Sequence, residues 1–521
     1  MDAPFGMIDR AEEFAWLFPP ARHNRRAVLW RSATKARAFM GAMFRMLFRQ
    51  TLLFLPAQLL PALCQFVQLI VWSHLAPASV IGVVTLFTSI QEFLNIAFMG
   101  FWNQYTQRYM LKHGETPEGQ VRMRHASTLV VILSVAFQIV IALLCFALMI
   151  DRAMSFAMAA ALAGLVGCRA LNLFQAERAR ARGDVLGYSV AVMSGPVIGF
   201  LIGLALLYRF GGSALLIFSG FAVAQLAGVL FSLTRDRSWI GFGRPDTALI
   251  RHALGYGMPI IVSSVLAWVS QNASRFAVSY AFGLSAVGVY SLGMGLGYRA
   301  SLVSAMMVNA AAFPIAVRMA NAGDLPGARR QLATNGALLF AVLAASVAGL
   351  ALVSGDVVRL FVSSRMDGPV QPVMLWSLLA GGCICLRQYF LNQFFLLEGN
   401  TRPIAIISIA EAVVAVLLAA IAVPLGGPVG GAIALAATSA IGMIATYIWA
   451  GSAGRQVAGQ AWARIALATA AMAGAVLMTP PAGDAAHLGI RIAAGGLAFC
   501  AALALLFAKD VMPRLKRLRR S

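Results

Sequence analysis

The chain has 521 residues and a net charge of +22, and it is 60% hydrophobic but only 12% charged, with a mean hydropathy of +0.80. Soluble domains usually carry about 25% charged residues, so this composition excludes a soluble globular protein. No basic and aromatic nucleic-acid-binding module accompanies the positive charge. We therefore expect the charge to set membrane topology and attract anionic lipid, with no nucleic acid as partner.

Hydrophobic segments long enough to cross a bilayer recur along the chain. A membrane-spanning helix needs roughly 20 mainly apolar residues, and fourteen segments meet this requirement. They predict helices at 50–73, 79–101, 127–150, 154–175, 185–208, 214–234, 254–281, 287–312, 334–353, 373–398, 403–424, 427–448, 462–479 and 488–508. The six cysteines lie in apolar runs and match no disulfide or zinc pattern. The sequence therefore predicts an all-α polytopic membrane protein with about 14 transmembrane helices.

Basic residues collect in every second gap between these segments. Of the 41 Lys and Arg residues, 33 lie in the N-terminal tail, in alternate gaps or in the C-terminal tail, when Arg169 near a segment end is counted with them. Five lie in the other gaps, and Arg275, Arg299 and Arg387 lie within predicted helices. Because cytoplasmic loops collect Lys and Arg, we expect a multi-pass protein of a bacterial inner membrane with both termini cytoplasmic. The number of helices is then even, and twelve stays open as an alternative to fourteen.

A short internal repeat predicts how the helices are grouped. Three residues recur 206 positions later in the chain: Ser79, Gly82 and Val83 match Ser285, Gly288 and Val289. Both copies begin on the same side, which predicts two six-helix lobes related by an axis along the membrane normal. The expected parts are a basic tail with an amphipathic interfacial helix at 1–49, an N-lobe at 50–234, a C-lobe at 254–448, a helix pair at 462–508 and a basic cytoplasmic tail at 509–521.

Polar residues inside the predicted helices concentrate at 50–73, 79–101, 254–281, 287–312 and 373–398. Such residues are costly in a bilayer and usually face protein or a water-filled cavity. Their helical spacing places them on single faces, which predicts a cavity between the lobes. The candidate cavity residues are Gln65, Gln68, Asn95, Gln271, Asn272, Arg275, Tyr298, Arg299 and Arg387, and the candidate coupling or ion-pair residues are Glu92 and Glu411.

The predicted cavity is cationic, with three arginines and Glu92 as its main acid. Arginine presents forked donors to phosphate, and amide side chains can bind sugar hydroxyls, so an anionic and hydroxyl-rich ligand would fit. The repeat places Glu92 opposite Tyr298, next to Arg299, which favours an interlobe Glu92–Arg299 pair. The alternatives are that the amides join helices to one another, and that each arginine forms a structural pair or extends to the membrane interface.

The stretch 256–299 carries motifs of a known family. Its motifs are, in order, Tyr256, Gly257 and Pro259; Arg275 and Phe276; and Gly283, Val287, Gly288, Tyr290 and Ser291. This order resembles Wzx-type polysaccharide flippases of the multidrug/oligosaccharidyl-lipid/polysaccharide (MOP) exporter superfamily. The resemblance covers about residues 50–450. The chain departs from the family at Ser274, where Asp is common, and so lacks a local acid–arginine pair there.

The resemblance implies two six-helix lobes and a central cavity that opens alternately to the two faces. The expected cargo is a polyprenyl-diphosphate-linked oligosaccharide, moved from the cytoplasmic to the periplasmic leaflet for polysaccharide biosynthesis. Membrane lipids, and polysaccharide polymerase or assembly proteins, are the further expected partners of a monomer.

Other functions stay open at this point. They are a cation-coupled multidrug exporter of the same superfamily, a lipid II flippase, a membrane glycan polymerase or ligase, and a non-transporting scaffold. The sequence carries no DxD, GxSxG, HExxH or phosphate-loop motif. We therefore expect a transporter rather than an enzyme, with no cofactor and no metal.

Overall fold

A computed structural model of the chain describes residues 56–518, except 58, 151–153, 322, 365 and 455–458. The predicted tail at 1–49, with its amphipathic helix, lies outside the described residues. Within the described ranges every regular element is a helix. The helices are an apolar segment Leu59–Leu75, α2 (Ala78–His113), α3 (Pro117–Met149), α4 (Phe156–Arg182), α5 (Val185–Met193), η2 (Ser194–Gly199), α6 (Phe200–Phe210), α7 (Ala214–Arg235), α8 (Thr247–Asn321), α9 (Leu325–Leu352), α10 (Ser354–Phe361), α11 (Asp367–Leu386), η3 (Arg387–Leu391), α12 (Asn392–Leu397), α13 (Arg402–Gly454), α14 (Gly459–Met478) and α15 (Ala485–Leu518).

The described residues contain eleven helices long and apolar enough to cross a membrane. Two of these, α8 and α13, are each broken by a glycine that separates two predicted spans. Gly283 breaks α8 with φ 77° and ψ −177°, and Gly427 breaks α13 with φ 55°. Positive φ is open to glycine without steric cost. With the shorter helix Leu59–Leu75, these segments account for the fourteen predicted spans and confirm an all-α polytopic fold.

Local signals fix where individual helices begin and end. The hydroxyl of Ser155 accepts a hydrogen bond from the backbone N–H of Met158 at 3.2 Å and so caps α4 at its first turn. At the other end Gly183, with φ 72°, ends α4 in the left-handed conformation. A side-chain oxygen at the N-cap satisfies a backbone donor that has no partner within the helix. Asp184 then caps α5 in the same way, accepting from Gly187 at 3.0 Å.

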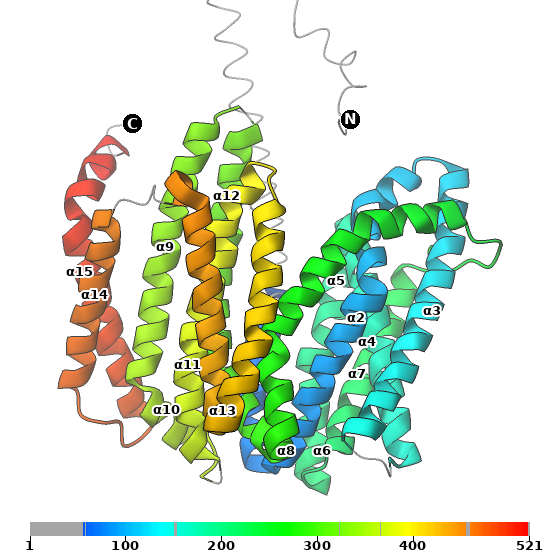
Figure 1. Cartoon of the computed structure of the whole chain (residues 1–521), viewed down its shortest axis with the longest axis horizontal. Coiled ribbons are helices and arrows are strands. Elements are labelled where there is room, and N and C mark those ends of the chain that lie inside the picture. Colours follow the sequence, from blue (N-terminus) through cyan, green and yellow to red (C-terminus); the bar gives the residue numbers. More distant parts are fainter. Residues whose placement is uncertain are drawn as a thin grey trace, which may run out of the picture. The chain divides into compact units, whose positions relative to one another are not determined.

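The helices form two groups on either side of α8 (Figure 1). Helices α2, α3, α4 and α7 pack against one another, and α2 makes the most extensive contact with α8. On its other side α8 packs against α9, α11 and α13, while α14 and α15 pack against each other and against α9. We call these sets the N-terminal bundle (α2–α7) and the C-terminal bundle (α9–α13). The long, kinked α8 is therefore the element that joins them.

The internal repeat appears in the structure as a close crossing of α2 with α8. A Cβ atom on Gly82 would overlap the carbonyl oxygen of Leu284, and one on Gly288 would overlap that of Ala78. These two contacts are related by the offset of 206 residues. Thr85 and Ser291, also 206 apart, share a hydrogen bond of 3.0 Å. Small residues let helix backbones approach closely in membranes, and the repeat therefore marks this crossing.

We expect Gly288→Ala to destabilise the protein by about 1–3 kcal/mol, because the new methyl group must push two backbones apart in a packed crossing. Gly255→Ala is the matched control, because Gly255 lies on the same helix with open space around its Cβ position. The control should be neutral or stabilising by up to about 1 kcal/mol through helix propensity. Thermal unfolding of the detergent-purified variants measures both. Equal melting temperatures for the two variants would contradict the crossing.

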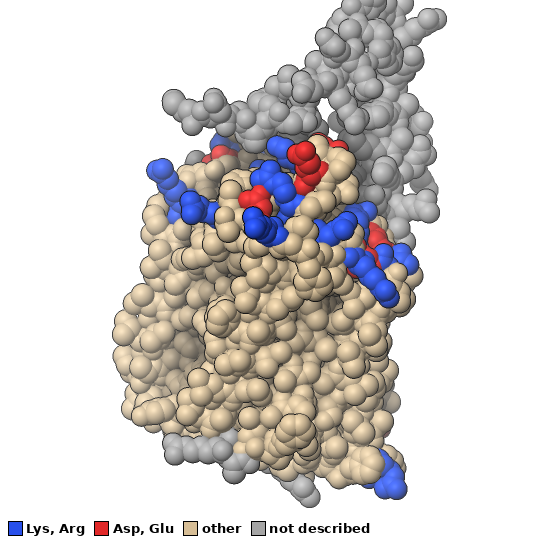
Figure 2. Space-filling view, turned by 90° about the vertical axis from the view of Figure 1, so that its right-hand side faces the viewer, with Lys and Arg blue, Asp and Glu red and all other residues tan. Residues whose placement is uncertain are grey.

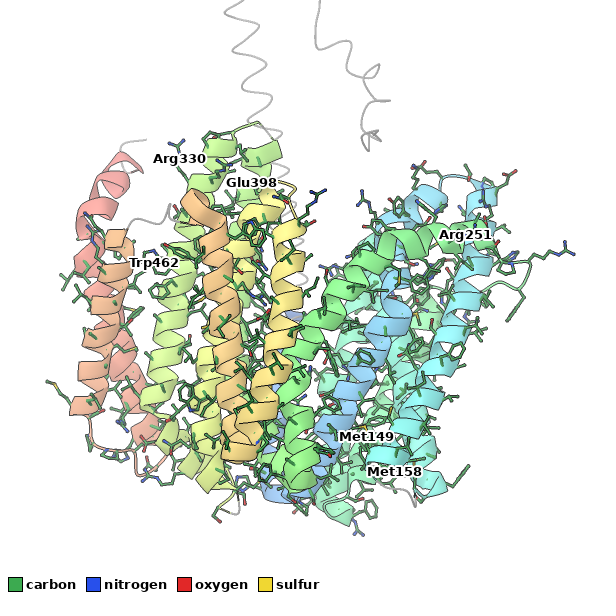
Figure 3. The ribbon with its side chains drawn as sticks, viewed as in Figure 1. Met149, Met158, Arg251, Arg330, Glu398 and Trp462 are labelled. Atoms are coloured by element: carbon green, nitrogen blue, oxygen red, sulfur yellow. The ribbon has the colours of Figure 1, made fainter. Side chains whose placement is uncertain are left out.

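Charged residues gather at one end of the helices. On the face drawn in Figure 2, most Lys, Arg, Asp and Glu side chains collect at one end, one basic group lies at the opposite end, and the middle of the surface is apolar. Arg251, Arg330 and Glu398 lie at this charged end, whereas Met149 and Met158 lie at the opposite end (Figure 3). An apolar middle with a basic end is the distribution expected for a protein that spans a bilayer.

Candidate functional site

A cavity of about 410 Å³ lies between the N-terminal bundle and α8. Its walls come from the helix Leu59–Leu75, from α2, α4 and α7, from the π-helical turn η2 at Pro196, and from both halves of α8. The predicted residues that line it are Gln65, Gln68, Glu92, Gln271, Asn272, Arg275, Tyr298 and Arg299. The structure thus brings together polar side chains from four of the predicted spans.

Helix α8 supplies the largest share of the polar wall because its kink presents two faces to the same space. Gln271, Asn272 and Arg275 precede the break at Gly283, and Tyr298 and Arg299 follow it. Within each half these residues are spaced by one, three or four positions, which places them on one face of a helix. The Tyr298 hydroxyl donates to the Gln271 side chain across the two halves at 3.4 Å.

Arg275 is held by three neighbours in the cavity wall. Its guanidinium donates to the Ser89 hydroxyl on α2 and to Asn272 Oδ1, the latter at 2.8 Å, and it lies 3.4 Å from the sulfur of Met294. Its Nε has no hydrogen-bond partner among the described residues. A guanidinium positioned in this way gives the cavity wall a fixed positive charge.

Arg299 ties α8 to the helix Leu59–Leu75. Its guanidinium donates to the backbone carbonyl oxygen of Gln65. Because one carbonyl uses only part of the five donors of a guanidinium, Arg299 keeps donors for a ligand. The same residue therefore joins two walls of the cavity and adds positive charge to it.

Arg169 of α4 also lines the cavity, which corrects the sequence count that placed it with the cytoplasmic basic residues. The cavity thus contains three arginines and one carboxylate, Glu92. In the described part of the chain, no salt bridge joins Glu92 to Arg299 or to Arg169. Sequence analysis also did not predict Thr85 as a cavity residue. Arg169 could have been identified, because it is a lone ionisable residue inside an apolar run.

Two further polar atoms of the wall lack partners. Gln68 Oε1 and Trp72 Nε1 are buried and make no hydrogen bond to the described residues. A buried polar atom left unpaired costs about 1–3 kcal/mol. An acceptor from Gln68 and a donor from Trp72 therefore favour water or a hydroxyl-bearing ligand in this space over a purely apolar one.

Three predicted residues lie away from the cavity. Arg387 and Glu411 form an ion pair with each other, and their side chains are only 9% and 3% exposed. Arg387 begins the π-helical turn η3, and Glu411 lies on α13. Asn95 is on α2, one turn beyond Glu92, and its Oδ1 has no hydrogen-bond partner among the described residues. Neither the ion pair nor Asn95 contributes to the cavity wall.

An apolar groove of about 290 Å³ lies between α8 and α13. Trp268, Ala273 and Phe276 line it from α8, and Val416 and Ala420 line it from α13. Helix α8 therefore presents polar residues at 271, 272 and 275 to the cavity and apolar residues of the same turns to the groove. The polar cavity and the apolar groove therefore lie on different faces of α8.

These features define a class: a polytopic α-helical membrane protein in which a cationic cavity lies beside a kinked central helix, as in transporters. The sequence profile of the family described as polysaccharide biosynthesis protein matches residues 75–370, and the chain belongs to this family. No curated protein sequence shows significant similarity to the chain.

Several solved membrane-protein structures are similar to this chain in fold. The lipid II flippase MurJ in an inward closed conformation has a TM-score of 0.72 at 12% identity, covering 88% of this chain and 100% of its own. An inward-facing multidrug resistance transporter of the MATE family has a TM-score of 0.56 at 16% identity, covering 78% and 95%. A MOP transporter from Pyrococcus furiosus, described by the reverse polarity of its binding pocket, has a TM-score of 0.50 at 16% identity, covering 80% and 94%. The predicted membership in a polysaccharide biosynthesis family is confirmed, and these structures show that the chain has the same fold.

Proposed function

We propose that this protein moves a polyprenyl-diphosphate-linked oligosaccharide across the membrane by alternating access. The observation that carries the proposal is the cavity with Arg169, Arg275 and Arg299 against the single carboxylate of Glu92. Arginine pairs with phosphate through forked, charge-assisted hydrogen bonds, and amide and hydroxyl groups such as Gln271 bind sugar hydroxyls. Membership in a polysaccharide biosynthesis family supports a sugar-bearing cargo.

The groove beside the cavity provides a place for the lipid part of this cargo. A headgroup held near Gln271 and Asn272 lies one helix away from the apolar wall formed by Trp268 and Phe276. A polyprenyl chain is apolar, so its transfer from water or polar surroundings into an apolar environment lowers the free energy. The tail would thus stay in lipid or in this groove while the headgroup crosses through the cavity.

Glu92 is the candidate for coupling transport to a proton. It lines the cavity and takes part in no salt bridge among the described residues. We expect Glu92→Gln to remove the dependence of transport rate on an imposed pH gradient while cargo binding persists. Proteoliposomes with and without the gradient measure this. A variant that keeps the full gradient dependence would exclude Glu92 from coupling.

A cation-coupled multidrug exporter is the second candidate, because the MATE transporters share the fold. Cationic drugs favour acidic cavities, and this cavity has three basic groups and one acid. The lipid II flippase activity stated for MurJ involves a lipid-linked sugar cargo of the same chemical class. The balance of charge therefore favours a lipid-linked anionic sugar over a drug.

The orientation and setting form part of the proposal. The basic end of the helices would face the cytoplasm of a bacterium, with both termini on that side of the inner membrane. Arg251 and Arg330 mark this end (Figure 3). Single cysteines introduced at these two positions should react with an impermeant thiol reagent only in inverted vesicles.

Polysaccharide polymerase and assembly proteins are the candidate protein partners of a monomeric transporter.

Deletion of the protein tests the function directly. Lipid-linked sugars of the deletion strain are fractionated by mass spectrometry, and an impermeant glycan label reports their sidedness. We expect a polyprenyl-diphosphate oligosaccharide to accumulate hidden from the label, with loss of a surface or secreted polysaccharide. An unchanged lipid-linked pool would favour the exporter. A short repeat unit that the label reaches would show that translocation succeeds and a later polymerisation step fails.

A further inference from the structure

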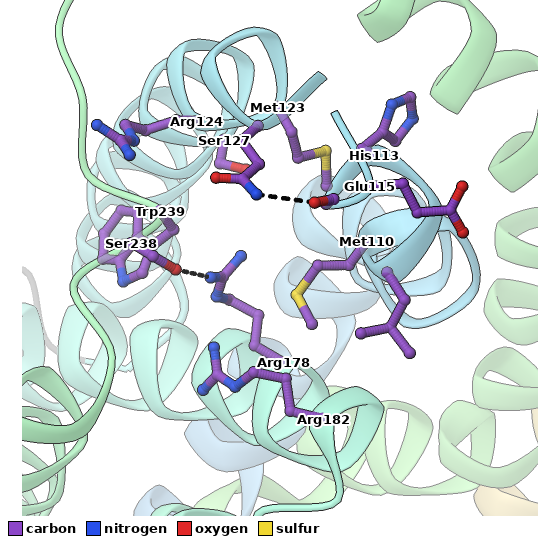
Figure 4. Close-up of a pocket in the computed structure, with 13 residues that line it drawn as sticks. Met110, His113, Glu115, Met123, Arg124, Ser127, Arg178, Arg182, Ser238 and Trp239 are labelled. Atoms are coloured by element: carbon purple, nitrogen blue, oxygen red, sulfur yellow. Dashed lines mark hydrogen bonds between the residues drawn. The ribbon is translucent and has the colours of Figure 1, made fainter. Parts of the chain in front are cut away.

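A second pocket, of about 450 Å³, lies within the N-terminal bundle at its charged end. The end of α2, the first turns of α3, the last turns of α4 and the loop after α7 surround it, and we call it the α2–α4 pocket. Figure 4 shows Arg178 and Arg182 on one side, Arg124 and Trp239 on a second side, and His113 and Glu115 across from them. It shares no lining residue with the central cavity.

Two arginines of the α2–α4 pocket, Arg178 and Arg182, are held in place by the loop after α7. Arg178, only 4% exposed, donates to the Asp236 carboxylate and to the Ser238 hydroxyl, each at 2.8 Å. Arg182 bonds the same carboxylate. Burial by itself would raise the pKa of Asp236, but the hydrogen bonds and charges of the two arginines outweigh it and hold that pKa well below its ordinary value. One permanently ionised carboxylate thus positions two guanidinium groups.

Several groups in the wall have no partner in the described part of the chain. The Ser127 hydroxyl is fully buried, the indole of Trp239 is 7% exposed, and neither Ser127 Oγ nor Trp239 Nε1 makes a hydrogen bond. Arg124 Nε is likewise buried and unpaired. Two of these three atoms are donors only, and the hydroxyl can also donate. The wall therefore has a surplus of buried donors around an open space, which calls for a ligand rich in acceptors.

We propose that the α2–α4 pocket binds a phosphate group attached to a carbon skeleton, as a site separate from the transport cavity. A phosphate offers only acceptors and negative charge, which matches three arginines, an indole N–H and a hydroxyl. Met110, Leu111 and Met123 form an apolar part of the wall, which suits the carbon part of the ligand. Basic pockets between membrane helices at this level bind phospholipid headgroups, and a soluble organic phosphate offers the same chemistry.

Binding is measured on the full-length protein purified in detergent. The lipid probes are phosphatidylglycerol and, as the zwitterionic comparison, phosphatidylcholine, followed by native mass spectrometry. The soluble probes are inorganic phosphate and pyrophosphate, followed by calorimetry and by their ability to displace the lipid. We expect one saturable site in the wild-type protein. Binding of phosphatidylglycerol alone assigns the site to a lipid headgroup, whereas binding of pyrophosphate or its competition with the lipid assigns it to a soluble phosphate.

Matched variants locate the site. Arg124→Gln combined with Arg182→Gln removes two charges from the pocket and should weaken binding at least tenfold. Arg180→Gln combined with Arg244→Gln removes two exposed arginines outside the pocket wall and should leave the affinity within twofold. Ser127→Val keeps every charge but removes the hydroxyl and narrows the space, and it should also weaken binding. Melting temperatures confirm that each variant is folded.

Two results would overturn the proposal. One is a wild-type protein that binds none of the four probes saturably. The other is a pocket variant that is folded and binds as tightly as the Arg180→Gln and Arg244→Gln control. Neither result depends on transport activity, so a failed phosphate site would leave the proposed translocation untouched.

Discussion

We expect Arg275→Gln and Arg299→Gln each to lower the rate of lipid-linked oligosaccharide translocation about 10- to 100-fold, and their combination to abolish it. A hydrogen bond to a charged group contributes about 1.5–3 kcal/mol, and about 1.4 kcal/mol corresponds to a factor of ten. Arg275 is already oriented by Ser89 and Asn272, so its loss removes a positioned donor. Proteoliposomes with an impermeant glycan label give the rate.

Three comparisons separate the cavity charge from general effects. Arg209→Gln removes an exposed arginine at the end of α6, outside the cavity, and should leave the rate unchanged. Arg275→Lys keeps the charge but loses the planar fork, so an intermediate rate is expected. The melting temperature reports whether loss of the Arg299 bond to the Gln65 carbonyl unfolds the protein. Full activity of a folded double variant would exclude these arginines from cargo binding.

The membrane itself explains why the fold could be predicted from sequence. A bilayer demands about 20 apolar residues per span and leaves no unpaired backbone groups, so hydropathy alone locates the helices. The break at Gly283 falls between two predicted spans, and the break at Gly427 falls on the first residue of one, because glycine accepts the positive φ that the sharp turns require. Hydropathy does not report the tertiary packing of the helices. The repeat containing Gly82 and Gly288 predicted two related lobes, whereas the close crossing of α2 with α8 at these glycines is seen only in the structure.

The candidate site could be predicted where helical periodicity places several polar residues on one face of a helix and that face lines the cavity. This holds for Gln271, Asn272 and Arg275, which occupy one stripe of α8. Periodicity does not say which neighbour a face meets, so Arg387 was expected in the cavity although it pairs with Glu411, a candidate ion-pair residue. Arg169 was assigned to membrane topology because it lies near the end of a predicted span, although it lines the cavity.

The ion pair of Arg387 with Glu411 leads to the second large effect that we expect. Both side chains are almost completely buried in the C-terminal bundle. Removing one partner leaves an uncompensated charge in a region of low polarity, which costs about 3–5 kcal/mol. Arg387→Leu and Glu411→Leu should therefore each lower the melting temperature strongly. The double variant should recover most of the loss, because apolar side chains of similar volume often replace a buried pair without penalty.

The pair of Arg329 with Glu398 provides the matched control. It joins the same two residue types at 2.6 Å, but its side chains are 37% and 32% exposed. Partly exposed pairs contribute about 0–1 kcal/mol, so Arg329→Leu should hardly change the melting temperature. The double-mutant cycle separates the two sites, since partners in contact deviate from additivity by about 0.5–3 kcal/mol. Additive losses at Arg387 and Glu411 would show that the two charges do not stabilise each other. Strong coupling together with full transport in the double variant would assign the pair to stability and leave Glu92 as the carboxylate available for coupling.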